Sequence, residues 1–165
     1  MTGPAYVQRT AHLSTDGMYR YRLTRQWDNG ILLAFIMLNP STADADVDDP
    51  TIRRCMGFAR RERFAGIVVG NLYAFRATRP EDMKWANDPF GPGNAGALDR
   101  IADEAEGAPI VCAWGSSGGI FGGHRAFIGR LQRRKATLVC LGKGANGMPR
   151  HPLYVRAAQP LEAYP

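Results

Sequence analysis

Cysteine is scarce in this sequence, and long hydrophobic runs are missing. The three cysteines, Cys55, Cys112 and Cys140, form no C-x-x-C pair and have no histidine at zinc-finger spacing, so we expect buried thiols rather than metal ligands or nucleophiles. An odd number of cysteines also suits a reducing compartment better than a disulfide framework. No apolar run approaches the roughly 18 residues of a membrane helix. Residues 1–4 carry no cationic start to an apolar segment. We therefore expect a soluble cytoplasmic protein without a membrane partner.

Acidic residues are absent between residues 107 and 161, although the chain has 15 of them and a net charge of +6. The basic residues of that stretch are Arg125, Arg130, Arg133, Arg134, Lys135, Lys143, Arg150 and Arg156. A second basic cluster, opposed only by Glu62, consists of Arg53, Arg54, Arg60, Arg61, Arg63, Arg76 and Arg79. One-sided charge raises the affinity for polyanions. We expect a nucleic-acid partner, and the simpler alternative is a basic surface kept for solubility.

Two motifs that bind phosphate or metal are also missing. The glycine-rich stretch at 115–123 lacks the G-K-[ST] of a phosphate loop, so a turn explains it. The acidic run Asp44, Asp46, Asp48 and Asp49 lacks the glycine and the terminal glutamate of a calcium loop. We expect no metal site and no cofactor. Asp48 and Asp49 should cap the next helix, which leaves Asp44 as the best carboxylate for assisting a water molecule.

The length of 165 residues and the 45% hydrophobic content fit one ordinary domain, which we assign to residues 1–165. Alternating apolar residues predict a strand at 19–23, and a nearly continuous apolar run predicts a buried strand at 31–38. The sequence Asp28-Asn29-Gly30 between them predicts a hairpin turn.

Helices and strands alternate along the rest of the chain. Asp49 followed by Pro50 predicts a helix start, with Arg53 and Arg54 facing outward. The later elements are expected to be a strand at 66–71, a Pro-rich loop at 76–92, a helix at 94–105, a strand at 109–114, a helix at 124–134 and a strand at 136–141. This alternation predicts a three-layer α/β sandwich, with a central mainly parallel sheet covered by helices on both faces and preceded by an N-terminal β-hairpin.

Polar residues follow several of the predicted strands, and the binding site of a parallel α/β sheet lies outside these carboxyl ends. Asn39 and Pro40 follow the second strand, and Asn71 ends the third. An amide that ends a buried strand needs a hydrogen-bond partner, and its simplest role is a turn that shapes the loop. Two asparagines closing neighbouring strands favour a shared site, which Trp114 and the loop at 142–154 would join.

His151 belongs to that C-terminal loop, where Pro152 holds it extended. A lone loop histidine is more often a surface residue than a catalyst, but its place near two asparagines favours a functional role. The neighbouring cation Arg150 would disfavour imidazolium, so we expect a neutral ring, whose tautomer stays open.

Four segments together resemble the domain-of-unknown-function family 1643. They are MLNPSTAD at 37–44, DPTIRRC at 49–55, NLYAFRAT at 71–78 and PRHPLY at 149–154. The resemblance runs from about Tyr19 to Pro160. The family label names no reaction.

A more distant resemblance links the chain to the uracil-DNA glycosylase superfamily. Its members place a water-positioning Asp or Asn before a proline at the end of the first core strand, and Asn39-Pro40 is similar. They end a later strand with an asparagine that reads the pyrimidine edge, as Asn71 would. Their C-terminal H-P loop contacts the base and enters the minor groove, as His151 and its flanks would. The VCAWG segment at 111–115 resembles their apolar strand ending in W-G. The resemblance implies a uracil-DNA-glycosylase-like fold and a DNA partner.

The sequence departs from that superfamily around the base pocket. Met37 stands where members have glycine, and Ser41 stands where they have an aromatic residue or glycine. No tyrosine follows Pro40 to exclude a 5-substituent, which favours a bulkier modified base over uracil. The four cysteines of the iron–sulfur branches are absent, so no cluster is expected.

The resemblance implies a monofunctional DNA glycosylase that flips a modified pyrimidine and hydrolyses its N-glycosidic bond, leaving an abasic site in repair or antiphage defence. Glucosylated hydroxymethylcytosine of a phage genome is one such base. The expected catalytic residues are Asn39, His151 and Asp44; the expected substrate contacts are Asn71, Pro40, Ser41, Thr42, Tyr73 and Trp114; and the expected DNA contacts are Arg53, Arg54, Arg76, Lys143 and Arg150. We expect a monomer.

Three alternatives stay open at this point. The first is a non-catalytic nucleic-acid-binding module of the same fold. The second is an N-glycosidase on free nucleosides, which would not need two arginine clusters. A Cys-His hydrolase is the least favoured, because no cysteine ends a strand beside His151.

Overall fold

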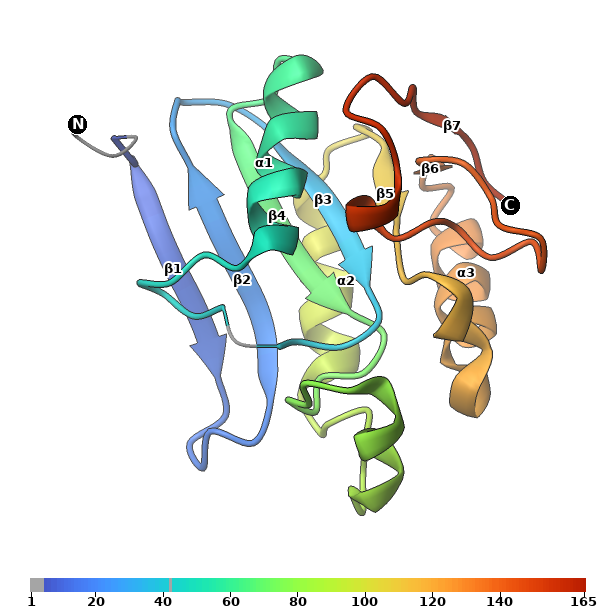
Figure 1. Cartoon of the computed structure of the whole chain (residues 1–165). Helices are drawn as coiled ribbons and strands as arrows, with labels where there is room; N and C mark the ends of the chain where they lie inside the picture. The colour runs from blue at the N-terminus through green and yellow to red at the C-terminus, as the bar shows by residue number, and fades with distance from the viewer. Residues whose placement is uncertain (1–4, 42) are drawn as a thin grey trace.

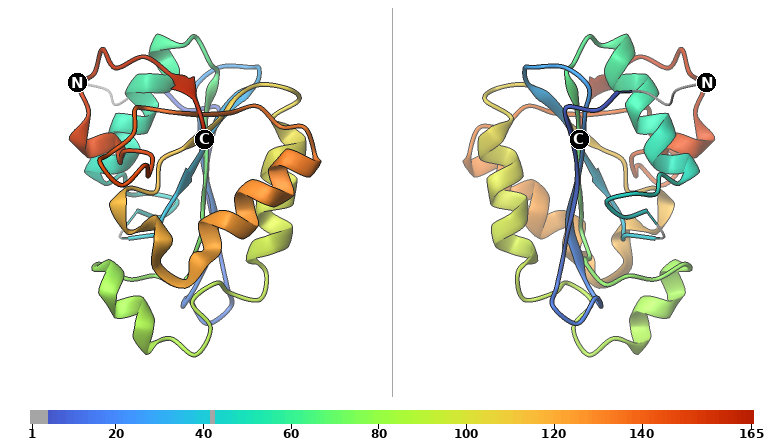
Figure 2. Two further views of the ribbon diagram at one scale, coloured as in Figure 1. Left: turned by 90° about the vertical axis from the view of Figure 1, so that its right-hand side faces the viewer. Right: turned by 90° about the vertical axis from the view of Figure 1, so that its left-hand side faces the viewer.

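The computed structural model describes residues 5–41 and 43–165, which form a seven-stranded sheet with helices on both faces (Figures 1 and 2). The strands are β1 (Gln8–Leu13), β2 (Arg20–Gln26), β3 (Leu32–Met37), β4 (Gly66–Asn71), β5 (Ile110–Cys112), β6 (Leu138–Cys140) and β7 (Glu162–Ala163). The helices are α1 (Pro50–Arg61), α2 (Asn94–Glu104) and α3 (Gly123–Arg133), and the 3-10 helices are η1 (Pro80–Trp85), η2 (Ser116–Gly122) and η3 (Pro152–Tyr154). The α/β class is confirmed. Thr42, an expected substrate contact, lies outside the described residues.

The sheet is mixed rather than mainly parallel. Its strand order is β1-β2-β4-β3-β5-β6-β7. The neighbouring strands β4, β3, β5 and β6 pair in parallel, whereas the β1–β2, β2–β4 and β6–β7 pairs are antiparallel. Because the four parallel strands end at one edge of the sheet, the residues that follow them are brought close together there.

The hairpin predicted at Asp28-Asn29-Gly30 is wrong. β2 and β3 do not pair with each other, because β4 lies between them: Val69 pairs with Leu23 on one side and with Phe35 on the other. The N-terminal antiparallel pair is instead β1–β2. β1 is mostly exposed and polar, so it lacks the apolar alternation that revealed β2.

Alternate residues of β3 pack into the two halves of the core. Phe35 and Met37 pack against α1, in a cluster that includes Phe58. Ile36 packs on the opposite face, in a cluster that includes Ile101 of α2 and further side chains of α3. Figure 2 shows α1 on one side of the sheet and α2 and α3 on the other. The nearly continuous apolar run of this strand is therefore explained by burial on both faces.

The helices begin close to the predicted positions. The Asp49 side chain accepts the Ile52 N–H at 2.9 Å, and Pro50 takes the first helical position of α1. The three cysteines are buried, as expected, and burial raises the pKa of the Cys55 and Cys112 thiols. Within residues 5–41 and 43–165, no helix has the length and apolar character needed to span a membrane.

Candidate functional site

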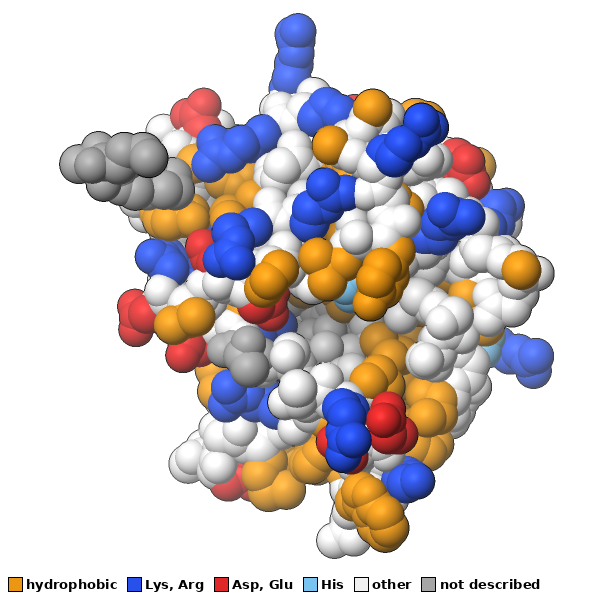
Figure 3. Space-filling view, viewed as in Figure 1, with side chains coloured by type: hydrophobic (Ala, Val, Ile, Leu, Met, Phe, Trp, Pro, Cys, Tyr) orange, Lys and Arg blue, Asp and Glu red, His pale blue; other side chains and the backbone are white. Residues whose placement is uncertain are grey.

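A cavity of about 530 Å³ lies at the carboxyl edge of the parallel strands, on the face covered by α1 and η3. Figure 3 shows a hollow in the middle of this face, with Lys and Arg side chains around it. The lining residues with polar side-chain atoms are Arg20, Asn39, Ser41, Asp49, Thr51, Asn71, Thr78, Trp114, Ser116, Ser117, Asn146, Arg150, His151 and Tyr154. The structure thus brings together the strand-end residues and the loop histidine that the sequence singled out.

Asn71 is a cavity-lining residue whose side chain has no hydrogen-bond partner. It ends β4 opposite Met37 of β3, so both residues face the α1 side of the sheet. The residue is 1% exposed, and neither its Nδ2 nor its Oδ1 finds a partner among the described residues. Asn94 of α2 donates to the Asn71 backbone carbonyl at 2.9 Å, which fixes the strand end from the opposite face. The amide is therefore free to donate and accept at once.

Asn39 lies two residues after the end of β3, and its side chain holds the loop in place while also lining the cavity. The Nδ2 group donates to the Pro40 carbonyl at 3.1 Å and to the Ala77 carbonyl at 2.7 Å. The loop-shaping role considered from the sequence is therefore real. The Oδ1 oxygen accepts no hydrogen bond within the described part of the chain, so it is left as an acceptor at the site.

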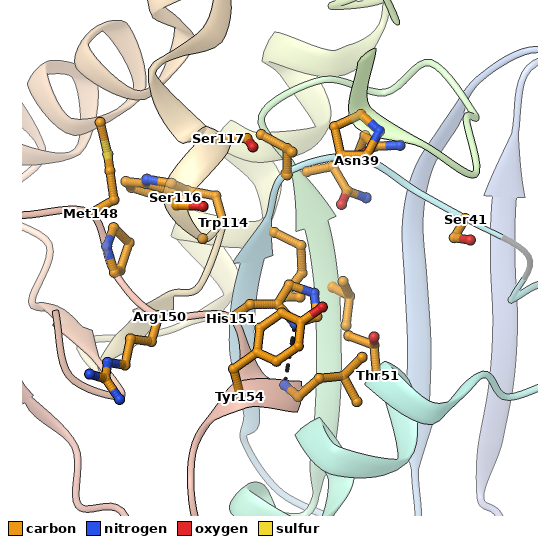
Figure 4. A pocket seen from close by; sticks show the side chains of 18 of the residues that line it. Asn39, Ser41, Thr51, Trp114, Ser116, Ser117, Met148, Arg150, His151 and Tyr154 are labelled. Carbon is orange, nitrogen blue, oxygen red and sulfur yellow. Dashed lines mark hydrogen bonds between the residues drawn. The ribbon is translucent and has the colours of Figure 1, made fainter. Parts of the chain in front are cut away.

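His151 enters the cavity from the C-terminal loop, beside Tyr154 (Figure 4). Its Nδ1 accepts the Leu153 N–H at 3.2 Å, so the neutral ring carries its proton on Nε2. Burial lowers the pKa of His151, and the charge of Asp49 partly opposes this shift. The lowered pKa favours the neutral ring that the sequence predicted, but its cause is burial rather than the charge of Arg150, whose side chain extends away from Asn39 in Figure 4.

Trp114 forms one wall of the cavity, two residues after the end of β5. The side chain is 1% exposed, and its Nε1–H has no partner within residues 5–41 and 43–165. Gly118 lies against the indole so closely that a Cβ atom there would come within 1.9 Å of Cδ1. A glycine at 118 is therefore required for the ring to hold its position, which gives the glycine-rich turn a structural purpose.

Asp44, an expected catalytic residue, does not line the cavity. Its Oδ1 accepts the backbone N–H groups of Asp46 and Val47, each at 2.8 Å, and these hydrogen bonds lower the pKa of the carboxyl group. The carboxylate that does line the cavity is Asp49. Among the residues that the structure describes, no group of three or more His, Cys, Asp or Glu side chains could hold a metal ion.

Two charged lining residues, Arg20 and Asp49, were not predicted to belong to the site. Arg20 is 3% exposed and donates to the Ala43 carbonyl, while its Nε finds no partner among the described residues. Burial lowers the pKa of Arg20 to about 10, so the group stays charged at neutral pH. In the sequence, Arg20 is a polar residue of an alternating strand, a pattern typical of a side chain that faces solvent. Asp49 already had a predicted role as the cap of the next helix.

Two expected substrate contacts, Tyr73 and Pro40, do not line the cavity. The Tyr73 hydroxyl donates to the Ile120 carbonyl and accepts the Gly123 N–H at 3.0 Å, so it ties the start of α3 to the sheet and lies outside the cavity lining. Pro40 is buried beneath the loop and does not line the cavity either. Ser41 does line it.

Arg53 and Arg54, which were expected to act alike on DNA, have different environments. Arg53 is exposed, and its side chain makes one hydrogen bond to the described residues, to the Asp48 carbonyl at 2.9 Å. Arg54 is half-buried and donates to the carbonyls of Pro152, at 3.2 Å, and Val155. The prediction that Arg54 faces outward is wrong, because its guanidinium group ties η3, and with it the histidine loop, to α1.

The remaining expected DNA contacts also differ in their exposure to solvent. Lys143 and Arg150 are exposed, and Arg150 lines the cavity. Arg76 is half-buried and donates to the Gly17 carbonyl at 3.3 Å. Only part of this set is therefore free to contact phosphates.

The basic residues of α3 lie on the face opposite the cavity (Figure 2). Arg130 pairs with Asp99 of α2, and Arg134 pairs with Asp103. The acid-free stretch of the sequence is thus partly neutralised in space by acids from an earlier helix.

Residues 20–153 match the family model described as Protein of unknown function (DUF1643). The matched range contains every cavity-lining residue except Tyr154. No curated protein and no solved structure matches the chain. The family expected from the four sequence segments is confirmed, and the chain belongs to the DUF1643 family.

Proposed function

We propose that the protein is a monofunctional DNA glycosylase that hydrolyses the N-glycosidic bond of a modified pyrimidine flipped into the cavity. The observation that carries this proposal is the Asn71 amide, whose two polar atoms are buried at the cavity without partners. Leaving such a group unpaired costs about 1–3 kcal/mol. The edge of a pyrimidine presents a donor and an acceptor side by side, which is the pattern that would satisfy both atoms.

His151 supports the proposal because it supplies a neutral donor. Its Nδ1 is occupied by the Leu153 N–H, so the Nε2–H is the group available to a ligand. When the glycosidic bond breaks, its electron pair leaves with the base, which becomes anionic. A preorganised hydrogen bond to that anion lowers the barrier by roughly 3 kcal/mol. In the proposed reaction, His151 donates this hydrogen bond.

Asn39 would hold the attacking water. Its Nδ2 is bound to two backbone carbonyls, so the orientation of the amide is fixed and Oδ1 can accept a hydrogen bond from water. After the C1′–N bond breaks, this water adds to C1′ of the sugar cation and releases a proton to the departing base or to solvent. The distant resemblance to the uracil-DNA glycosylase superfamily assigns Asn39 the same role.

The size of the cavity favours a base larger than uracil. Its volume of about 530 Å³ lies within the range of roughly 300–1,000 Å³ that drug-sized ligands occupy. Ser116, Ser117 and Asn146 line it on the Trp114 side, where a polar substituent of the base could find hydrogen bonds. A hexose on hydroxymethylcytosine is such a substituent.

Exposed groups near the cavity suit a DNA duplex. Arg53 and Arg150 are free to contact phosphates. Leu153 and Tyr154 follow the histidine and are 40% and 77% exposed, in a loop whose counterpart in the glycosylase superfamily enters the minor groove. We propose that the enzyme acts as a monomer on DNA in the cytoplasm, in repair or antiphage defence.

The test is a panel of DNA substrates incubated with the wild type and Asn39→Ala. The panel contains uracil, alkylated bases, hydroxymethylcytosine and glucosylated hydroxymethylcytosine, and alkali reveals abasic sites. Strand breaks at one modified base with the wild type, and about a hundredfold fewer with the variant, are the expected result. DNA binding without an abasic product on any substrate would favour the non-catalytic module instead.

A variant of a surface arginine distinguishes a DNA glycosylase from an N-glycosidase that acts on free nucleosides. Arg54 is unsuitable for this test because it holds the histidine loop. The variant Arg53→Ala, whose side chain is exposed and does not line the cavity, should weaken cleavage of DNA and leave hydrolysis of a free nucleoside nearly unchanged. Equal activity of wild type and variant on DNA would contradict a DNA substrate.

A further inference from the structure

Asp49 combines a structural role with a free carboxylate oxygen in the cavity. Oδ1 accepts the Ile52 N–H and so caps α1. Oδ2 makes no hydrogen bond or ion pair within residues 5–41 and 43–165. Among the described lining residues, Asp49 is the only one with a carboxylate. One oxygen of this group is therefore sufficient for the helix, and the other is available to a ligand.

The neighbouring acids are occupied elsewhere. Asp48 pairs with Arg25 at 2.7 Å and accepts the Tyr6 hydroxyl at 3.1 Å. Asp44 accepts two backbone N–H groups of its own turn. The sequence offered four aspartates within six residues, and the fold brings one of them to the site.

The charge of Asp49 acts on two other residues that line the cavity. It raises the pKa of His151 and the pKa of the buried Arg20, in each case against the effect of burial. Arg20 donates to the Ala43 carbonyl and forms no ion pair in the described chain. The Asp49 carboxylate and the Arg20 guanidinium therefore both line the cavity as charged groups, and they form no ion pair with each other.

We propose that Asp49 is the carboxylate that stabilises the sugar cation during glycosidic bond cleavage. This inference rests on the proposed glycosylase function. As the C1′–N bond breaks, both electrons go to the base, and the positive charge is shared between C1′ and the ring oxygen of the sugar. A fixed anion near that charge lowers the barrier without taking up a proton or forming a bond. Water then adds to C1′, and Asp49 is unchanged at the end of the reaction.

Asp49→Asn is the decisive variant, because asparagine caps a helix as well as aspartate does. The thermal unfolding transition of the protein should be nearly unchanged, because the cap of α1 is kept while the negative charge of residue 49 is lost. Under single-turnover conditions on the base that the wild type excises, we expect the rate to fall by about a hundredfold or more. The Kd for the same DNA should change less than about threefold, because the cation exists only as the bond breaks.

Asp44→Asn is the matched control, since it removes an equal charge five residues away and outside the cavity. It should retain most of the wild-type rate. In Asp49→Asn, NMR titration should also show a lower pKa for His151 than in the wild type, which a purely structural cap would not cause. A rate for Asp49→Asn equal to that of the wild type, or an equal loss in Asp44→Asn, would overturn the assignment and leave the glycosylase function intact. No abasic product from the wild type would overturn the function, and the role of Asp49 with it.

Discussion

Asn71 places an unpaired polar group in the core, at a cost in stability to the fold. Its amide is buried with both polar atoms unpaired, at the end of a strand whose other residues are apolar. Replacing it with leucine removes two unpaired groups, and the adjacent cavity gives the larger side chain room. We expect Asn71→Leu to keep or raise the free energy of unfolding, by up to about 2 kcal/mol, and to abolish base excision. Urea denaturation and a single-turnover assay measure the two quantities.

Asn94→Leu is the matched control for this prediction. Asn94 is also buried, but its Nδ2 donates to the backbone carbonyls of Asn71 and Leu72 at 2.9 and 3.1 Å. Its loss should lower the free energy of unfolding by about 1–3 kcal/mol. If Asn71→Leu lost as much stability as Asn94→Leu, the Asn71 amide would be structural.

Protonation of the His151 ring should make both the stability and the turnover of the protein depend on pH. Burial lowers its pKa, so between that value and about 6.5 the unfolded chain binds more protons than the folded protein does. Stability therefore rises with pH across this window and is lost as pH falls through it. Protonation also takes the Nδ1 lone pair from the Leu153 N–H. We expect turnover to persist at pH 6.5 and to fall only at lower pH, in parallel with the NMR titration of His151.

Removal of the ring should separate chemistry from binding. His151→Ala loses the donor to the departing base, so we expect turnover to fall by about a hundredfold with DNA affinity nearly intact. An equal loss of turnover and affinity would show that His151 binds DNA rather than stabilising the leaving group.

At the level of elements, α1 holds the histidine loop through Arg54. The guanidinium group donates to the carbonyl of Pro152, the first residue of η3, and to that of Val155, which follows η3. Arg54→Ala should lower the free energy of unfolding by about 2 kcal/mol and reduce turnover, because the loop is released. Arg53→Ala, one residue earlier and exposed, should leave the unfolding transition unchanged and weaken DNA binding. Identical effects of the two variants would contradict the tether.

The elements that the sequence predicted well are those whose pattern is local. The strand at 66–71 and the start of α1 follow from an apolar run and from a capping aspartate with proline. The predicted hairpin failed because the partner of β3 is chosen by packing on both faces, and a turn sequence carries no information on that choice. β1 and β7 are exposed edge strands, so neither shows an apolar alternation.

The sequence predicted those residues of the site that lie at the ends of strands. Asn39, Asn71 and Trp114 meet because parallel strands end at one edge. Arg20 was not predictable, because β2 runs antiparallel to the other strands that form the site and contributes its first residue rather than its last. The sequence favoured Asp44 over Asp49 as the carboxylate of the site, but Asp49 is the one that lines the cavity, because the turn that diverts Asp44 depends on backbone geometry.

For the whole molecule, the distribution of charge decides how it would meet DNA. The exposed arginines on the cavity side include Arg53 and Arg150, whereas Arg125 and Arg133 are exposed on α3, across the sheet. Each phosphate contact contributes about 0.9 to the slope of log affinity against log salt concentration. Replacing Arg53 and Arg150 with alanine should therefore lower the magnitude of that slope by about two. The α3 pair reduces the net charge equally, from +6 to +4, and its replacement should leave the slope unchanged. Fluorescence anisotropy at several salt concentrations measures both, and equal slopes for the two double variants would mean that overall charge, rather than the cavity face, attracts DNA.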